Sequence, residues 1–178
     1  MGNVWRADRP QRGRFRQFMQ CDIDILGEPT YLAEIELILA TTTLLGKLDF
    51  KNFTIRINNR KMLKGLAKYC GFPEESYDDV FIILDKMDKI EMSGVEAELL
   101  EAGYDKEAVE KCKNLFETVT NDLDGVRYMK ETLGDCLEEG VAEDLETIIQ
   151  TVEKVKAADF KIAFDPTLVR GMSYYTGP

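Results

Sequence analysis

The chain has 178 residues, the length of one ordinary domain or of one domain that carries an insert. Its 44% hydrophobic and 31% charged residues allow a buried core and exclude a disordered or fibrous protein. The net charge is −10, and the absence of histidine excludes histidine-based triads and imidazole acid–base catalysis.

The start of the chain predicts an antiparallel hairpin with a long, arginine-rich loop. The first 20 positions carry five arginines and one acidic residue, whereas the rest of the chain has a net charge of −14. Pro10 and Gly13 supply turn chemistry between the two strands. Polar and apolar residues largely alternate over residues 14–26, which predicts a strand of that length. One face of this strand would hold Gln20, Asp22 and Asp24.

A helix, a strand and a second helix are predicted next. Residues 31–45 are typical of a helix, and Gly46 occupies the position at which a glycine commonly ends one. Residues 53–58 alternate again and predict a strand. Asn59 is a suitable N-cap for a helix over residues 60–70, which the following glycine would close.

Between residues 74 and 153 the chain becomes strongly acidic, and every segment has a helical pattern. This stretch holds 24 acidic and seven basic residues, and it predicts an all-helical insert with a solvated acidic surface. Apolar residues at 80–84 mark the middle of one helix, and residues 106–119 and 141–156 predict two further helices. Residues 161–164 predict a short strand. We therefore divide the chain into a first core part, a helical insertion and a return to the core, at residues 1–72, 73–158 and 159–178.

The cysteines and the apolar runs indicate a cytoplasmic protein without a membrane partner. The four cysteines form no C-x-x-C pair, so we expect reduced thiols rather than a zinc ribbon. The longest apolar runs fall well short of the roughly 20 residues that a membrane span needs. The charged first residues also give no sign of a secretory signal peptide.

Chemistry-bearing side chains gather in two clusters at opposite ends of the chain. Arg6 and Arg170 are permanent cations whose planar forks match phosphate or carboxylate. Gln20 and Asp24 would share a strand face, about 13 Å apart at roughly 3.3 Å per residue. Two adjacent tyrosines near the end of the chain add hydroxyls and aromatic walls. Such a site suits a ligand with a phosphate and a nitrogenous, positively polarised group, and the residues alone leave the reaction open.

Two longer strings resemble a known enzyme family. Residues 5–24, with the string Arg-Pro-Gln-Arg-Gly-Arg-Phe-Arg, closely resemble motif 2 of histidyl-tRNA synthetases. Residues 168–177, Leu-Val-Arg-Gly-Met-Ser-Tyr-Tyr-Thr-Gly, resemble the histidine-specific signature of the same enzymes. The resemblance implies an α+β fold: part of the antiparallel sheet of a class II synthetase catalytic core, with an inserted all-helical subdomain.

The resemblance also implies the reaction and the role of each site residue. Members of the family use ATP with Mg²⁺ to convert histidine to histidyl-adenylate, and then transfer the histidine to tRNA(His). By position, Arg6 and Arg170 are the catalytic cations on the two sides of the ATP α-phosphate. Four residues would bind histidine, namely Gln20, Asp24, Tyr174 and Tyr175. Asp8 and Arg14, together with Arg6, would contact ATP and frame the tRNA acceptor end.

The family further implies a homodimer for the full-length enzyme and no metal held by protein side chains. Asp8 stands where motif 2 usually has glutamate, and Ser173 stands where many relatives have aspartate. Motif 1, the motif 3 arginine, the second histidine signature and the anticodon-binding domain are missing. We therefore expect a fragment of the catalytic domain without measurable aminoacylation of its own. The alternative is a non-catalytic relative such as the regulatory subunit of ATP phosphoribosyltransferase; the retained Arg6 and Arg170 favour the ligase.

Overall fold

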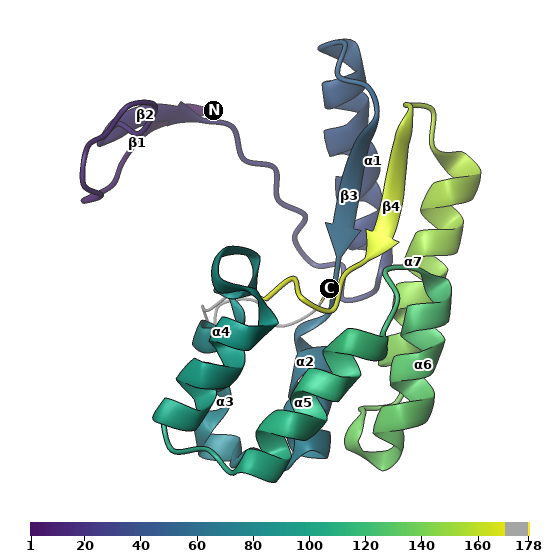
Figure 1. The fold of residues 1–178 in the computed structure, drawn as a ribbon. Coiled ribbons are helices and arrows are strands. Elements are labelled where there is room, and N and C mark those ends of the chain that lie inside the picture. Colours follow the sequence, from purple (N-terminus) through teal and green to yellow (C-terminus); the bar gives the residue numbers. More distant parts are fainter. Residues whose placement is uncertain (170–177) are drawn as a thin grey trace.

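The computed structural model describes residues 1–169 and residue 178 of the chain. Its first element is an antiparallel hairpin of β1 (Gly2–Trp5) and β2 (Gln17–Gln20), which confirms the predicted hairpin and its long loop. In Figure 1 the hairpin stands apart from the helices, and an irregular segment connects it to them.

β2 is shorter than predicted, because it ends at Gln20 rather than at residue 26. Gln20 pairs with Gly2 at the start of β1, so residues 21–26 run past the end of the partner strand. A segment without a partner forms no ladder of hydrogen bonds and stays irregular. Asp24 therefore lies outside the strand, and the prediction that it shares a strand face with Gln20 is wrong.

Helix α1 (Leu32–Lys47), strand β3 (Phe53–Ile57) and helix α2 (Arg60–Cys70) follow close to their predicted positions. Asn59 caps α2 as predicted, since its side chain accepts a hydrogen bond of 2.8 Å from the backbone N–H of Lys61. The glycine after α2 has a φ of 94° and ends the helix in the left-handed conformation.

The prediction that Gly46 ends α1 is wrong, because this glycine lies inside the last turn of the helix. A Cβ atom at Gly46 would come within 3.3 Å of the Cβ of Ala158, just before strand β4 (Phe160–Phe164). Glycine at this position therefore allows α1 to approach the segment that leads into β4.

The acidic part of the chain is helical almost throughout, as predicted. Its elements are η1 (Glu74–Ser76), α3 (Tyr77–Leu84), α4 (Met87–Glu101), α5 (Lys106–Thr118), α6 (Leu123–Leu133), η2 (Gly134–Cys136) and α7 (Val141–Val155). The sequence alone set no bounds for α4 and α6. α4 contains a kink at Glu91, whose φ of 59° is not helical. Within the described part of the chain, every helix lacks the length and apolar character needed to cross a membrane.

β3 and β4 pair in parallel, which brings the two ends of the helical stretch side by side. The register runs from Phe53 opposite Phe160 to Ile57 opposite Phe164. The rings of Phe53 and Phe160 stack with their centroids 5.5 Å apart. Figure 1 shows α1 and α7 beside this pair of strands, where they enclose a small apolar cluster.

A larger apolar cluster runs through α2, the helices α3–α7 and the end of β4. Its fully shielded members include Leu66, Phe81, Leu145 and Phe164. α2 belongs to the predicted core part and α3–α6 to the predicted insertion, so shared packing holds these two parts together. The division of the chain at residues 72 and 158 stays a prediction.

Truncating Leu66 to alanine is expected to lower the free energy of unfolding by about 2–5 kcal/mol, because the change leaves a cavity in the large cluster. The control Lys64→Ala, at an exposed position of the same helix, is expected to change it by less than about 0.5 kcal/mol. Urea unfolding followed by circular dichroism measures both values. Equal effects of the two substitutions would contradict the assigned core.

The cysteine thiols are expected to differ strongly in reactivity. All four are free: Cys21 is exposed, whereas Cys70 and Cys112 are buried. A hydrogen bond with Cys70 and burial raise the pKa of the Cys112 thiol well above its ordinary value. Since the thiolate is the reactive form, iodoacetamide at about pH 8 should modify Cys21 long before Cys70 and Cys112. Peptide mass spectrometry measures the order, and equally fast labelling of Cys112 in the folded chain would contradict it.

Candidate functional site

Arg6 and Gln20, two of the predicted site residues, lie together on one face of the hairpin. Arg6 follows β1 directly, and its backbone N–H donates to the carbonyl oxygen of Arg16 at 2.8 Å. Its guanidinium Nη2 donates to Oε1 of Gln20 at 3.4 Å, and its Cζ lies 5.3 Å from the centroid of the Phe18 ring. An aromatic face attracts a cation, so the hairpin holds this guanidinium over β2. A guanidinium has five N–H donors, and the contact with Gln20 leaves donors for an anionic ligand.

Phe18, which the sequence analysis did not single out, contacts the predicted site residue Arg6. It is half-buried in β2, as is Gln20, whereas the alternating residues Gln17 and Met19 are exposed. Phe18 pairs with Val4, and Arg6 lies two residues beyond Val4 on the same face. The sequence signal for this contact is that Phe18 and Gln20 are two positions apart, which places them on the same face of a strand.

The loop between β1 and β2 holds Asp8 and Arg14, both exposed. A tight turn closes the loop: the backbone N–H of Arg14 donates to the carbonyl oxygen of Gln11 at 2.9 Å, and Gly13 has a φ of 78°. Nε of Arg16 donates to the carbonyl oxygen of Asp8 at 3.3 Å. The hairpin therefore presents a local positive surface on an acidic chain, through Arg6, Arg9, Arg12, Arg14 and Arg16.

The other predicted site residues lie in the hairpin loop, beyond the end of β2, or outside the described part of the chain. Asp24 is exposed and lies beyond the end of β2. Gln20, which contacts Arg6, also donates from Nε2 to the carboxylate of Asp22. Three predicted residues lie outside the described part of the chain, namely Arg170, Tyr174 and Tyr175.

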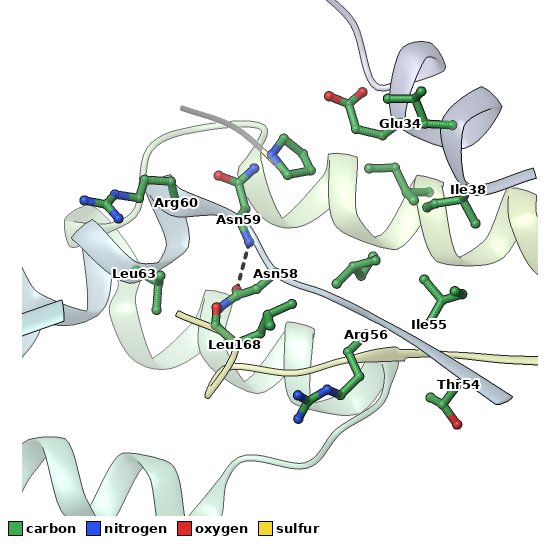
Figure 2. Close-up of a pocket in the computed structure, with 14 residues that line it drawn as sticks. Glu34, Ile38, Thr54, Ile55, Arg56, Asn58, Asn59, Arg60, Leu63 and Leu168 are labelled. Atoms are coloured by element: carbon green, nitrogen blue, oxygen red, sulfur yellow. Dashed lines mark hydrogen bonds between the residues drawn. The ribbon is translucent and has the colours of Figure 1, made fainter. Parts of the chain in front are cut away.

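A cavity of about 560 Å³, which no sequence pattern predicted, lies at the end of β3. Figure 2 shows Glu34 and Ile38 of α1 on one side of it, with the residues that follow β3 opposite. Oε2 of Glu34 is buried and accepts no hydrogen bond from the described residues. A buried carboxylate oxygen favours a hydrogen-bond donor or cation beside it. Leu168, the first residue of the histidine-specific signature, and Pro178, which directly follows the signature, also line this cavity.

Comparison with known proteins decides the family. The family model described as histidyl-tRNA synthetase matches residues 1–178. The chain belongs to the histidyl-tRNA synthetase family. Two curated relatives are named histidine–tRNA ligase: the protein of Leifsonia xyli subsp. xyli is 44% identical, and that of Christiangramia forsetii is 38% identical, each over 98% of this chain.

Solved structures confirm the predicted α+β synthetase fold. The crystal structure of histidyl-tRNA synthetase from Nostoc sp. PCC 7120 matches 99% of the chain with a TM-score of 0.80 at 30% identity. A structure described as an ATP phosphoribosyltransferase regulatory subunit/histidyl-tRNA synthetase, from Bacillus halodurans C, matches 99% of the chain with a TM-score of 0.77. Its 19% identity shows the fold alone. The chain spans 41% of the Leifsonia and Nostoc proteins, 38% of the Christiangramia protein and 44% of the Bacillus protein.

Trp5 is the single tryptophan of the chain and reports on the hairpin. It is 69% exposed and precedes Arg6 directly. We expect acrylamide to quench its fluorescence in the folded chain nearly as strongly as in urea, because the indole is open to solvent on the hairpin. Strong protection in the folded chain would contradict the exposed position of this site. A dilution series separates protection by a second copy of the chain from protection within one copy.

Proposed function

We propose that this chain is the part of a histidine–tRNA ligase that carries motif 2 and the histidine-specific signature. The observation that carries the proposal is the pairing of Arg6 and Gln20 on one face of the hairpin. These residues match the family's phosphate-binding arginine and histidine-binding glutamine. Membership of the family supports the same reading.

In the proposed first step, a carboxylate oxygen of histidine attacks the α-phosphorus of ATP. An O–P bond forms, the bond to the β-phosphate oxygen breaks, and pyrophosphate leaves. Negative charge builds on the α-phosphate oxygens, so Arg6 on one side and Arg170 on the other lower the barrier as preorganised cations. The contacts of Arg6 with Phe18 and Gln20 restrict its position before ATP binds. No side chain needs to accept a proton in this step, which agrees with a chain that lacks histidine.

Histidine recognition is assigned to Gln20, Asp24, Tyr174 and Tyr175. The imidazole ring has one N–H donor and a second nitrogen, so a carboxylate and a phenol can bind both. A site that forms hydrogen bonds with its substrate rejects analogues that lack those groups by roughly 10⁴-fold or more. Asp24 lies four residues past Gln20, in an exposed segment outside the strand. The proposed site requires its side chain to reach the histidine ligand from this segment.

The partners in this proposal are ATP, histidine and tRNA(His), with a homodimer for the full-length, cytoplasmic enzyme. The exposed loop with Asp8 and Arg14 is assigned to ATP and to the tRNA acceptor end. Mg²⁺ enters with the ATP phosphates. Among the described residues there is no group of three or more acidic, cysteine or histidine side chains placed to hold a metal ion.

A regulatory subunit of ATP phosphoribosyltransferase is the second candidate, because the structure from Bacillus halodurans C bears that description and has this fold. Such a subunit would bind histidine without forming an adenylate. The retained arginines Arg6 and Arg170, and the 44% identity with a named ligase, favour the enzyme.

Residues 1–178, grafted into the intact Nostoc synthetase in place of the matching segment, provide the test. Arg6→Ala and Arg170→Ala are each expected to lower kcat for histidine-dependent ATP–pyrophosphate exchange by about 10²- to 10³-fold, since each removes a cation from the transition state. The control Arg127→Ala removes an arginine of α6 that is 53% exposed, and it should change kcat less than about twofold.

An Arg170→Ala protein that keeps full exchange activity would contradict the catalytic assignment. The host synthetase without the graft serves as the control for folding and for exchange activity. A folded chimera that binds histidine and forms no adenylate, while the host does, would favour the regulatory candidate.

A further inference from the structure

A buried carboxylate sits in the short turn between β4 and the histidine-specific signature. Asp165 is 2% exposed and directly follows β4. Both of its oxygens accept hydrogen bonds: Oδ2 from Nη1 of Arg56 at 2.8 Å, and Oδ1 from the backbone N–H and the hydroxyl of Thr167 at 2.9 and 2.6 Å. A carboxylate removed from water in this way is a strong local restraint, because each oxygen needs its donors in place.

β3 contacts the same turn through its backbone and the residue that follows it. The backbone N–H of Asp165 donates to the carbonyl oxygen of Ile57 at 2.9 Å, and the N–H of Leu168 closes the turn onto the carbonyl of Asp165 at 3.0 Å. Nδ2 of Asn58 donates to the carbonyl oxygen of Leu168 at 3.1 Å. Asn58 is itself buried, and its contact with Leu168 is partly shielded from water. These hydrogen bonds therefore connect the turn to the end of β3 and to Asn58, which follows it.

Apolar packing holds the turn at both ends. Phe164 before it has no exposed surface, and Val169 after it is 2% exposed; both belong to the large apolar cluster. Val169 immediately precedes Arg170 in the sequence. The last positions before the proposed catalytic arginine are thus fixed by packing, by backbone hydrogen bonds and by the ion pair of the buried Asp165 carboxylate with the half-exposed Arg56.

Arg56 also reaches a second carboxylate, that of Asp88 in α4, at 3.5 Å. The Asp88 side chain is 68% exposed, whereas that of Asp165 is 3% exposed. An exposed ion pair contributes little, but a buried carboxylate depends on its partner. Asp88 therefore provides a matched comparison: the same arginine and the same side-chain type, without the burial.

We propose that Asp165 is a positioning residue for Arg170, which it serves by fixing the turn that leads into the signature. The proposal rests on the role assigned to Arg170 under the proposed function. Asp165 acts through the backbone of the turn, with Arg56 and Thr167 as its partners, and it does not touch the substrates. Since a displacement of about 1 Å at a catalytic group can cost about 10²-fold in rate, a loosened turn lowers catalysis even when the fold persists.

A double-mutant cycle in the grafted synthetase tests this role. Asp165→Asn keeps the shape and removes the charge, and it is expected to lower kcat for ATP–pyrophosphate exchange by about 10²-fold with less than about a threefold change in KM for histidine. In the Arg170→Ala background the same substitution is expected to cause no further loss, because its effect passes through the missing arginine. Asp88→Asn should change kcat less than about twofold.

Thr167 supplies a milder pair of variants if Asp165→Asn does not fold. Thr167→Val removes one donor to the carboxylate and should lower kcat by about tenfold, whereas Thr167→Ser keeps the hydroxyl and should restore most of the activity. Thermal melting of each protein checks the fold. Losses from Asp165→Asn or Thr167→Val that multiply with that of Arg170→Ala, or the absence of any loss, would overturn the positioning role. Full activity of Arg170→Ala alone would overturn the proposed function as well, so the two failures are distinguishable.

Discussion

The parallel pairing of β3 and β4 is the constraint on which the rest of the structure depends. It joins parts of the chain that are far apart in sequence, as the ion pair between Arg56 and Asp165 shows across 109 positions. The intervening residues are almost entirely helical and pack into one apolar cluster with α2. Phe164 and Val169 belong to that cluster, so the core of the helical part also sets where the chain stands just before Arg170.

The hairpin that carries Arg6 obeys a different constraint. Its strands have four residues each, and Trp5, Phe15 and Met19 are all more than half exposed. A two-stranded hairpin is marginally stable in water by itself. The position of Arg6 therefore depends on a few local contacts, with Phe18 and Gln20, whereas the turn at Asp165 is held by deep burial. The two ends of the proposed site thus have unequal rigidity.

Local signals predicted much of the fold. The capping residue Asn59 predicted the start of α2, and the apolar spacing predicted α7. Both signals are local, because capping and helical periodicity act over a few residues. Predictions failed where a distant segment decides the outcome. Gly46 lies inside α1 because the chain near Ala158 approaches it, and β2 stops at Gln20 because β1 offers no further partner.

The residues of the candidate site also differ in whether local sequence signals predicted them. Recognised strings predicted Arg6 and Gln20, and the structure brings these residues together. The same strings assigned no role to Phe18 or Asp165. The direction in which β3 and β4 pair, which brings Arg56 to Asp165, also does not follow from alternation, because alternation within a strand is the same for parallel and antiparallel partners.

The long sequence separation between β3 and β4 has a consequence for the order of folding. The contacts among α2–α6 close shorter loops than the strand pair, which must close a loop of more than 100 residues, so we expect the helices to collapse first. The turn at Asp165 then orders late, after the helical core has formed. By then the helices have buried most of their hydrophobic surface in the large apolar cluster, so little of it is left to aggregate.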